Sequence, residues 1–584
     1  MSRPAPGGIP AVALAGAVGP VWSAVTDVPL RGAVAAPSPG EVAEVPLLDA
    51  AGARAGDEAA VAAGGTWDGL MERAGGHLAR AVVRLAGRGY GLRVAILVGK
   101  GDNGGDGWVA ARRLAAHGAQ AWIVASHPAD VEVSAASGGN RDRWVAAGGR
   151  VSWHLDDLEA ALDWCDVAVD ALLGTGVSGA PRGAVGEAAA ALLRARQAGV
   201  PIVACDVPSG VGSDDGAAPD GAVVADLTVT FGARKRGLLL HPGAAHAGEV
   251  VVGDLGPGWE APTGTWTALT AHGAAPEPLG VAADKRERGA VLVVAGAVGT
   301  SGAAALCSAG SLAAGAGLVT VAVPEPVRAE VAVHHPSAMV RGLPVDDDGA
   351  LSPEAVDALP DLEGFDAVVA GPGLGHGDGA AAVVAHLRRG ARRLVLDADA
   401  LNVHRDDNDA LAEHRGALVL TPHERELARI GGGSDGEQAW ADRVIRVPEL
   451  AARYRATVVA KGPGTMIAAP DGRVWVTPNG GPALGSGGTG DVLAGIVAAA
   501  IAGAADDDDV PRRVAQAVWW HAAAGVRAGG DRAQRATAVD LLDALPAVLG
   551  ELERVRAAAP GVRTLPPAHR AEAGDGAVAA GERP

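Results

Sequence analysis

Short apolar runs recur along the first half of this chain, separated by longer stretches with apolar residues at helical spacing. Such runs are typical of strands that are buried on both faces of a parallel sheet. The first two runs enclose an amphipathic stretch, Trp108–His117, and together they predict a strand–helix–strand unit. Glycine or a polar residue follows each run, at the strand end where open α/β sheets bind ligands. The five runs are Arg93–Gly99, Ala119–Ala125, Asp166–Gly174, Pro201–Gly210 and Ala225–Gly232.

A second alternation of the same kind begins at Gly289 and predicts a second parallel-sheet domain with alanine-rich helices. A long apolar helix is expected from Asp491, followed by a helix through Trp519, Trp520 and His521. The six predicted strands lie within residues 290–296, 318–324, 365–373, 392–400, 416–423 and 456–462.

The segments outside these alternations set the predicted domain boundaries. Residues 1–44 are rich in Pro, Gly and Ala without periodicity, which predicts a flexible arm, and periodicity is lost again between Gly256 and Asp284. We therefore expect a first domain at 45–256, a linker at 257–284, a second domain at 285–556 and a disordered tail at 557–584. Helices are expected from Val45 onward, from the spacing of Leu47, Leu48, Leu70, Met71, Leu78, Val82 and Val83.

The amino-acid composition supports an α/β fold class and limits the classes of binding partner that we expect. The chain is 48% hydrophobic but 3% aromatic, with 86 glycines, which fits a core of Val, Leu and Ala. A net charge of −19 opposes binding to nucleic acid or to an anionic membrane, so we expect neither partner. The three cysteines match no metal or disulfide spacing, which favours the reducing cytoplasm. Prolines and glycines break the apolar stretch Ile9–Val25, so it is not expected to span a bilayer; a signal peptide is the alternative.

The first glycine-rich loop, GKGDNGGDG at Gly99–Gly107, has the composition of a phosphate-handling turn. A helix beginning near Asp106 would aim the amides of Asn103–Asp106 at one anion, whereas a simple helix cap by Asp106 is the structural alternative. Asp170, and Asp206 with Ser209, end two further strands and are expected at the same sheet edge. Each aspartate alone could be a helix cap, but three converging strand ends favour a site.

The second loop, GSGGTGDVLAG at Gly485–Gly495, predicts a nest of amides at a helix N-terminus with Asp491 in its first turn. Such a carboxylate can remove a proton from a hydroxyl while the helix end stabilises a phosphoryl group; a buried, well-capped helix is the alternative. The segment Lys461–Thr465 is a second anion-type turn between a strand and a hairpin, and His423 ends another strand. Either could be purely structural.

Lysine is rare in this arginine-rich chain, and each lysine lies in or beside a glycine-punctuated segment. A compact point charge is well suited to a phosphate, although chance placement is the alternative. The lysines are Lys100, Lys235, Lys285 and Lys461.

Ordered motifs in the two halves resemble two enzyme families. The first half resembles the NAD(P)H-hydrate epimerases through GKGDNGGDG, VDALLGTGVSGAPRG, CDVPSGVGSDDG and ADLTVTFGARKRGLLLHPG. The second half is similar to the NAD(P)H-hydrate dehydratases through VAGPGLG, LDADALN, LTPHERE, KGPGT and GSGGTGDVLAG. Over about residues 45–556 the chain resembles the fused bacterial nicotinamide nucleotide repair enzymes. The resemblance implies an α/β fold with an N-terminal Rossmann-like parallel-sheet domain and a C-terminal ribokinase-like α/β domain.

By this resemblance, the substrates are NADHX and NADPHX, formed when water adds at C6 of the nicotinamide ring. The first domain would interconvert the R and S hydrates, and the second would dehydrate the S form at the expense of ADP, with Mg²⁺ accompanying the nucleotide. ADP rather than ATP is implied by the bacterial family alone. A potassium ion is implied for the epimerase domain, and we expect a homo-oligomer.

The resemblance also assigns residues. Asn103, Asp170 and Ser209 would hold potassium, with Asp170 also an acid/base candidate, and Asp491 would be the dehydratase base. Residues expected to contact the hydrate are Asp102, Asn103, Gly104, Gly105, Asp106, Gly174, Thr175, Gly176, Val177, Ser178, Gly179, Ala180 and Asp206 in the first domain, and Gly373 or Gly375, His423 and Asp491 in the second. The adenine nucleotide would contact Lys461, Gly462, Pro463, Gly464, Thr465 and Gly490.

Two positions depart from the family pattern. Asp102 replaces the first of two paired asparagines, which places an extra negative charge beside a pyrophosphate. Glu424-Arg425 replaces a proline-glycine after His423 and could shift that loop. An alternative enzyme is a ribokinase-like kinase of a small alcohol, which would release a stable phosphorylated product. In a non-enzymatic alternative, the N-terminal domain is a nucleotide-binding regulatory module, and an Asp170→Asn substitution would leave epimerisation unchanged.

Overall fold

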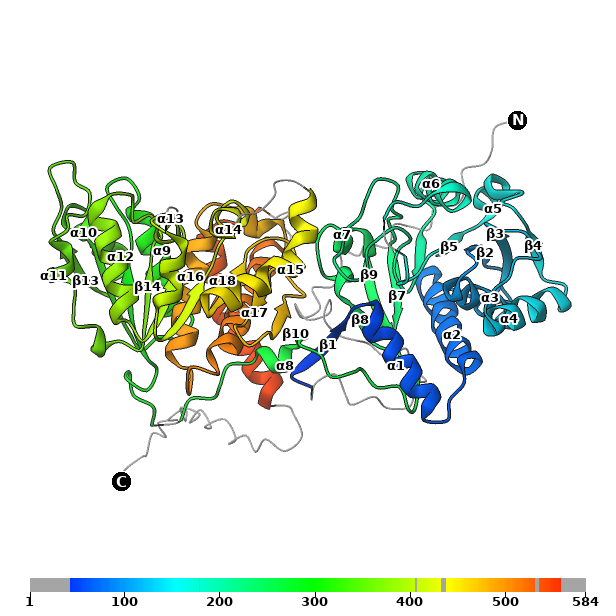
Figure 1. Ribbon diagram of the computed structural model, residues 1–584, viewed down its shortest axis with the longest axis horizontal. Helices are drawn as coiled ribbons and strands as arrows, with labels where there is room; N and C mark the ends of the chain where they lie inside the picture. The colour runs from blue at the N-terminus through cyan, green and yellow to red at the C-terminus, as the bar shows by residue number, and fades with distance from the viewer. Residues whose placement is uncertain are drawn as a thin grey trace, which may run out of the picture.

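The computed structural model describes residues 42–177, 179–280, 282–404, 407–431, 437–530 and 535–557. Two α/β units lie side by side, the N-terminal unit at one end and the C-terminal unit at the other (Figure 1). Residues 1–41 of the predicted arm and 558–584 of the predicted tail lie outside the described part of the chain.

The N-terminal unit is built on a parallel sheet of seven strands within the described residues, in the order β4-β3-β2-β5-β6-β7-β9. All five predicted strands are confirmed. Helices α2, α3 and α4 cover one face and α5 and α6 the other, so the central strands are buried on both sides. The bounds are β2 (Arg93–Val98), β3 (Gln120–Ala125), β4 (Arg150–Ser152), β5 (Val167–Ala171), β6 (Ile202–Cys205), β7 (Leu227–Phe231), β9 (Glu249–Gly253), α2 (Trp67–Ala86), α3 (Asp102–Ala116), α4 (Ala135–Ala146), α5 (Leu158–Trp164) and α6 (Gly183–Gln197).

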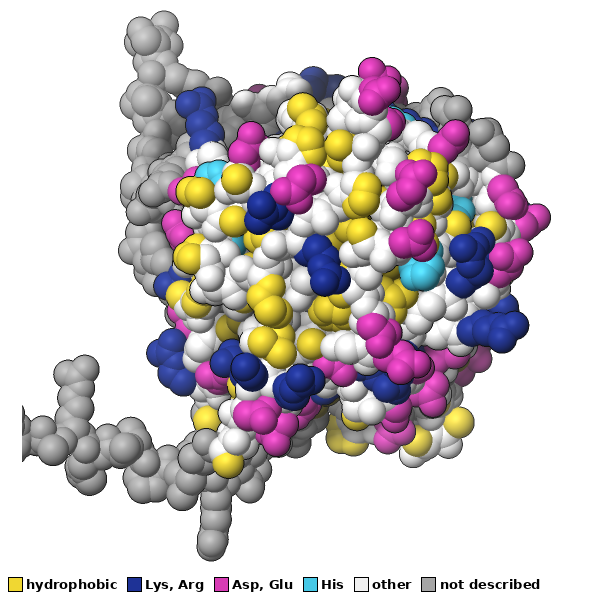
Figure 2. Space-filling view, turned by 90° about the vertical axis from the view of Figure 1, so that its left-hand side faces the viewer, with side chains coloured by type: hydrophobic (Ala, Val, Ile, Leu, Met, Phe, Trp, Pro, Cys, Tyr) yellow, Lys and Arg dark blue, Asp and Glu magenta, His cyan; other side chains and the backbone are white. Residues whose placement is uncertain are grey.

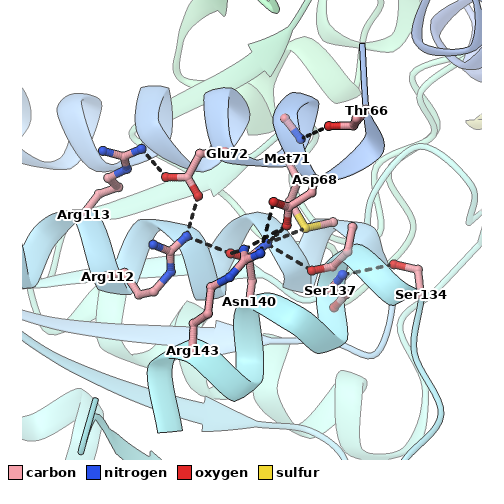
Figure 3. A network of polar contacts seen from close by, with 12 residues as sticks. Thr66, Asp68, Met71, Glu72, Arg112, Arg113, Ser134, Ser137, Asn140 and Arg143 are labelled. Carbon is pink, nitrogen blue, oxygen red and sulfur yellow. Dashed lines mark hydrogen bonds and ion pairs between the residues drawn. The ribbon is translucent and has the colours of Figure 1, made fainter. Parts of the chain in front are cut away.

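A polar network ties α2, α3 and α4 together (Figure 3). The Arg143 guanidinium donates to the Asp68 carboxylate at 2.8 Å, and Arg112 donates to the Asn140 side-chain oxygen at 2.7 Å. Glu72 accepts from Arg112 and pairs with Arg113. Because the three helices are cross-linked at these points, the position of α3 and of the glycine loop at its start is fixed against its neighbours.

The C-terminal sheet has twelve strands among the described residues, in the order β13-β12-β11-β14-β15-β16-β17-β18-β19-β10-β1-β8. The strands from β13 to β17 are parallel, and the predicted hairpin after Lys461 is confirmed as β18 and β19. All six predicted strands are present. The bounds are β11 (Ala290–Val294), β12 (Leu318–Pro324), β13 (Met339–Leu343), β14 (Ala367–Ala370), β15 (Arg393–Leu396), β16 (Ala417–Leu420), β17 (Ala456–Ala460), β18 (Met466–Ala468) and β19 (Val474–Val476).

Helices cover both faces of this second sheet. The predicted apolar helix is α16 (Thr489–Ala502), which packs beside α9 (Ser301–Ala313), α17 (Val510–Gly529) and α18 (Ala538–Ala557), while α12 (Asp378–Gly390) and α15 (Glu437–Tyr454) cover the opposite face. The remaining helices are α1 (Ala50–Ala62), α7 (Gly243–Ala247), α8 (Ala271–Ala274), α10 (Arg328–His334), α11 (Ala355–Ala358), α13 (Asp399–Asn402) and α14 (Glu424–Gly431).

The beginning of the described chain differs from the sequence prediction. Residues Glu44–Leu48 form strand β1 rather than helix, so the helical prediction for Leu47 and Leu48 is wrong. The strand pairs antiparallel with β10 (Trp266–Leu269) and parallel with β8 (Arg234–Lys235). Since β10 also pairs with β19, segments from before, within and after the N-terminal sheet extend the C-terminal one. Strand β10 lies inside the predicted 257–284 linker; the domain division itself stays a prediction.

Acidic and basic side chains are intermixed on the end of the molecule that carries the C-terminal unit, and neither sign dominates that face (Figure 2). Among the described helices, none combines the length and apolar character needed to cross a bilayer.

Candidate active sites

The first candidate site lies where the N-terminal strand order reverses, between β2 and β5. Loops after neighbouring strands diverge at such a point and leave a crevice for a ligand. Helix α3 begins at Asp102, earlier than the predicted start near Asp106. The Gly105 amide already donates to the Gly101 carbonyl at 3.3 Å. The Gly105 amide is thus bonded within the helix, and the amides free of helical bonding are those of the first turn before it.

Close packing explains most of the glycines in the first loop. A Cβ at Gly104 would overlap the Gly99 carbonyl, and one at Gly105 would meet the Met71 side chain. Gly101, the residue before the helix, faces open space and makes no side-chain cap. The helix start therefore remains accessible to an anion.

The three predicted potassium ligands form one connected cluster. The Ser209 hydroxyl donates to Asp170 Oδ1 at 2.6 Å, and the Ser209 amide donates to Oδ2 at 2.8 Å. The Leu173 amide donates to the Ser209 hydroxyl at 2.9 Å, while its carbonyl accepts from Asn103 Nδ2 at 2.7 Å. Burial raises the pKa of Asp170, and no basic side chain is among the groups that offset this effect. Asp170 is a fully buried carboxylate whose charge is offset by hydroxyl and amide donors rather than by a basic side chain, and a hard cation would suit such a group.

Asp206 lies beside this cluster and is paired with a lysine that the sequence analysis did not assign to the site. Lys235 Nζ donates to Asp206 Oδ1 at 2.6 Å and to the Thr230 hydroxyl at 3.1 Å, with the lysine 2% exposed. Asp206 has a φ of 62°, a strained value for a non-glycine residue that is common at functional sites. Burial, and then the charge of Asp206, raise the pKa of Asp106. The rarity of lysine was the one sequence signal that pointed to Lys235.

The predicted substrate loop at residues 174–180 follows β5. Its glycines at Gly176 and Gly179 face open space, and the Thr175 carbonyl accepts from the Ser213 hydroxyl at 3.3 Å. Ser178 lies outside the described residues. The loop therefore borders the crevice beside Asn103, whose Cβ would lie 3.3 Å from a Cβ at Gly174.

The second candidate site lies at the carboxyl ends of β14 to β17, opposite the start of α16. Gly488 precedes this helix with a φ of 88°, and no described side chain caps the first turn. Lys461 Nζ would lie 3.6 Å from a Cβ at Gly490, so the loop after β17 meets the glycine loop. A lysine beside uncapped helix amides is an arrangement that binds phosphate.

A chain of charged groups connects the predicted residues of this site. Lys461 Nζ donates to Asp397 Oδ1 at 2.7 Å and lies 4.0 Å from Glu426 Oε2. Glu426 Oε1 in turn lies 3.1 Å from His423 Nε2. Asp397 also accepts from the Thr421 hydroxyl at 2.8 Å. Asp397 and Glu426 were quoted within motifs but not assigned to the site; the available signals were the position of Asp397 directly after a strand and that of Glu426 three residues after His423.

Asp491 lies in the first turn of α16, as predicted, and is partly buried. Burial and the charge of Asp397 raise its pKa to about 6, and Lys461 opposes this rise. A carboxylate with this pKa is largely ionised at neutral pH yet basic enough to accept a proton.

Gly375 and His423, two further predicted residues, lie near the same carboxyl ends of the strands. The Gly375 amide donates to Asp399 Oδ2 at 2.9 Å, and the Asp399 charge contributes to the raised pKa of Asp491. His423 Nδ1 accepts from the Arg425 amide at 3.1 Å, so this histidine also holds the start of α14. Glu424-Arg425, where the sequence departs from the family pattern, forms the start of helix α14.

Comparisons with known proteins match both halves of the chain. A family profile described as NAD(P)H-hydrate dehydratase matches residues 291–547, and one described as YjeF-related protein N-terminus matches residues 68–237. These matches support the expected fold class of an N-terminal Rossmann-like and a C-terminal ribokinase-like unit.

Full-length relatives carry both units. The chain is 37% identical over 500 residues to the bifunctional NAD(P)H-hydrate repair enzyme Nnr of Moorella thermoacetica, covering 83% of this chain and 92% of the relative. It is 37% identical over 493 residues to the enzyme of the same name from Gloeobacter violaceus, covering 82% and 92%. The ADP/ATP-dependent NAD(P)H-hydrate dehydratase from Bacillus subtilis, crystallised with ATP and Mg²⁺, is 28% identical, covers 49% of this chain and 96% of its own, and has a TM-score of 0.41.

Proposed function

We propose a residue-level mechanism for this chain, which belongs to the family of bifunctional NAD(P)H-hydrate repair enzymes. As a member, it is an NAD(P)H-hydrate epimerase and an NAD(P)H-hydrate dehydratase, and it returns hydrated NADH and NADPH to their active forms. We assign epimerisation of the R and S hydrates to the β2–β5 crevice, and dehydration of the S form at the expense of ADP to the cleft before α16. The observation that carries this assignment is Asp491, a carboxylate with a pKa of about 6 beside uncapped helix amides and Lys461.

In the dehydratase site, Asp491 removes the proton from the ring hydroxyl of the S hydrate. The hydroxyl oxygen then attacks the terminal phosphorus of ADP, and AMP leaves. The first-turn amides of α16 and Lys461 stabilise the negative charge on the transferred phosphoryl group. The phosphorylated oxygen leaves C6 of the ring as phosphate far more readily than as hydroxide, the neighbouring C5 loses a proton, and the ring double bond between C5 and C6 is restored. We call Lys461–Thr465, which binds ADP together with Gly490, the nucleotide loop.

The neighbouring residues position this base and its substrate. Asp397 holds Lys461 in place, and its charge keeps Asp491 basic. His423, oriented by Glu426, and the Gly373–Gly375 turn bind the hydrate. Magnesium would neutralise charge on the ADP phosphates. Among the described residues, no three His, Cys, Asp or Glu side chains are grouped as a metal site.

In the epimerase site, the enclosed oxygens of Asn103, Asp170 and Ser209 would hold potassium, which supplies positive charge beside the dinucleotide. The first-turn amides of α3 and the 174–180 loop bind the hydrate. Asp206, neutralised by Lys235, faces the same crevice with Asp106. Proton transfer by Asp170 stays a prediction, which Asp170→Asn tests through the R-to-S rate.

One assay tests both assignments. Purified protein is incubated with mixed R and S hydrates, ADP and Mg²⁺, and recovery of the reduced-nicotinamide absorbance is followed. Complete recovery is expected, whereas recovery that stops when the S form is exhausted would refute the epimerase assignment. A stable phosphorylated product would instead support the small-alcohol kinase alternative. Repeating the assay with lithium in place of potassium should slow only the conversion of R to S.

The cellular setting is also part of the proposal. The three cysteines, Cys165, Cys205 and Cys307, are buried free thiols, which suits the reducing cytoplasm. Small molecules are the partners, and we propose a homo-oligomer without nucleic-acid or membrane binding, which light scattering of the purified protein would test.

A further inference from the structure

One short segment of the N-terminal half, Lys235–Leu240, touches both proposed sites. At its start, Lys235 pairs with Asp206 of the epimerase site at 2.6 Å. At its end, the backbone of Leu239 and Leu240 lies against Gly464 of the nucleotide loop. A 3₁₀ turn joins the two ends, and this region lies between the two units, near β1, β8 and β10 (Figure 1).

The contact with the nucleotide loop is close and buried. Gly464 has a φ of 66°, and a Cβ there would overlap the Leu239 carbonyl oxygen and lie 3.3 Å from Leu240 Cα. Leu240 is 4% exposed and belongs to the same apolar cluster as Ala460 and Met466, which flank the nucleotide loop. The N-terminal half thus supplies the surface on which this loop rests.

The segment is itself held firmly by its own unit. The Gly237 amide donates to the Ser213 carbonyl at 2.7 Å, and the Ser213 hydroxyl donates to the Thr175 carbonyl of the substrate loop. Arg236 pairs with Asp49 at 3.0 Å. Strand β8, at the start of the segment, pairs with β1 and so joins the C-terminal sheet. A support anchored on both sides has little freedom to withdraw from the loop.

We propose that Leu239 and Leu240 are positioning residues for the dehydratase reaction, acting from the epimerase half to hold the nucleotide loop in its ADP-binding conformation. The inference rests on the proposed function, because it needs the loop to bind ADP. A loop that is already ordered loses less conformational entropy when ligand binds, so its affinity is higher. The affinity for ADP is therefore set in part by the other catalytic unit.

Substitutions at Leu240 in the full-length protein test this proposal. Leu240→Ala removes a buried side chain from the apolar cluster that includes Ala460 and Met466 on either side of the loop, and Leu240→Met retains most of its volume. Leu387→Ala is the matched control, since Leu387 is a buried leucine of the same cluster, on α12. ADP binding is measured by calorimetry, and the KM for ADP and kcat are measured with the S hydrate, alongside thermal unfolding.

We expect Leu240→Ala to raise the Kd and KM for ADP about tenfold, or about 1.4 kcal/mol, with a much smaller change in kcat. Leu240→Met should recover most of the affinity, and Leu387→Ala should destabilise the fold without changing the Kd. Equal Kd values for Leu240→Ala and wild type, or equal weakening in the control, would overturn the inference. If Leu240→Ala does not fold, Leu240→Val decides by the same criteria with a smaller expected effect. Failure of the wild type to bind ADP would instead refute the proposed function.

Discussion

Replacing Asp491 with asparagine should abolish dehydration and at the same time stabilise the protein. Asn keeps the shape of the side chain but cannot accept the hydroxyl proton, so the dehydration rate should fall by a factor of about 10² to 10⁴. Conversion of the R to the S hydrate should continue, because it is assigned to the other unit. A catalytic carboxylate held in an unfavourable environment commonly costs stability.

The magnitude follows from the pKa of Asp491. Its folded value of about 6 lies above the ordinary 3.8, because of burial first and the Asp397 charge second. A raised carboxyl pKa means that folding favours the neutral form, so the penalty is present above pH 6 and disappears as the pH falls toward 4. The shift corresponds to at most about 3 kcal/mol, and solvent around this partly buried group reduces it to about 1–2 kcal/mol. Asn should recover that amount at neutral pH but nothing at pH 4.

Two measurements check this reasoning. The wild-type dehydratase kcat/KM should fall with an acid limb near pH 6, because only about a tenth of Asp491 is ionised at pH 5. Urea unfolding of wild type and Asp491→Asn at neutral pH and at pH 4 gives the stability difference. An acid limb near pH 4, or a variant that is less stable at neutral pH, would show that the pKa of Asp491 is not raised in the folded protein.

Three further outcomes follow from the same contacts. Asp397→Asn removes a charge that raises the Asp491 pKa, so the acid limb of the dehydratase pH profile should move to lower pH; an unchanged limb would contradict the assigned cause. Lys235→Gln should slow epimerisation at least about tenfold and cost about 3 kcal/mol in urea unfolding, because its carboxylate partner stays buried without a cation, while dehydration of pure S hydrate is retained. Gly104→Ala should destabilise the fold by about 2 kcal/mol or more through overlap with backbone, whereas Gly101→Ala, in open space, should be tolerated; equal unfolding midpoints would refute the packing argument.

Local patterns were sufficient for the central strands of both sheets, but not for the strands at the sheet edges or for features made by distant partners. The run at Arg93–Val98 is buried on both faces of the sheet, and its almost entirely apolar composition predicts this burial. The segment Glu44–Leu48 is a strand only because β10 and β8 lie beside it, from residues far along the chain. Helix α3 starts at Asp102 although its first turns are rich in glycine, a poor helix former, because those glycines allow close packing on Gly99 and Met71.

The chemical residues divide in the same way. The place of Asp491 in the first turn of a helix could be predicted from the sequence, because it depends on the local glycine-rich pattern alone. Asp397 and Glu426 contact Lys461, which lies after β17, because parallel pairing of β15, β16 and β17 brings these distant segments together. The spacing of these residues along the sequence does not predict that contact.

The two sites share the same arrangement of charged side chains, although they lie in different folds. In each, a lysine that is scarce in this chain pairs with an aspartate at the end of a parallel strand, Lys235 with Asp206 and Lys461 with Asp397. In each, a second carboxylate nearby has its pKa raised by burial and by that paired aspartate, Asp106 in one site and Asp491 in the other. Lysine suits this position because its compact ammonium neutralises one carboxylate without also forming a bidentate pair with the second. Each site therefore contains one aspartate that a lysine neutralises and a second carboxylate whose pKa is raised.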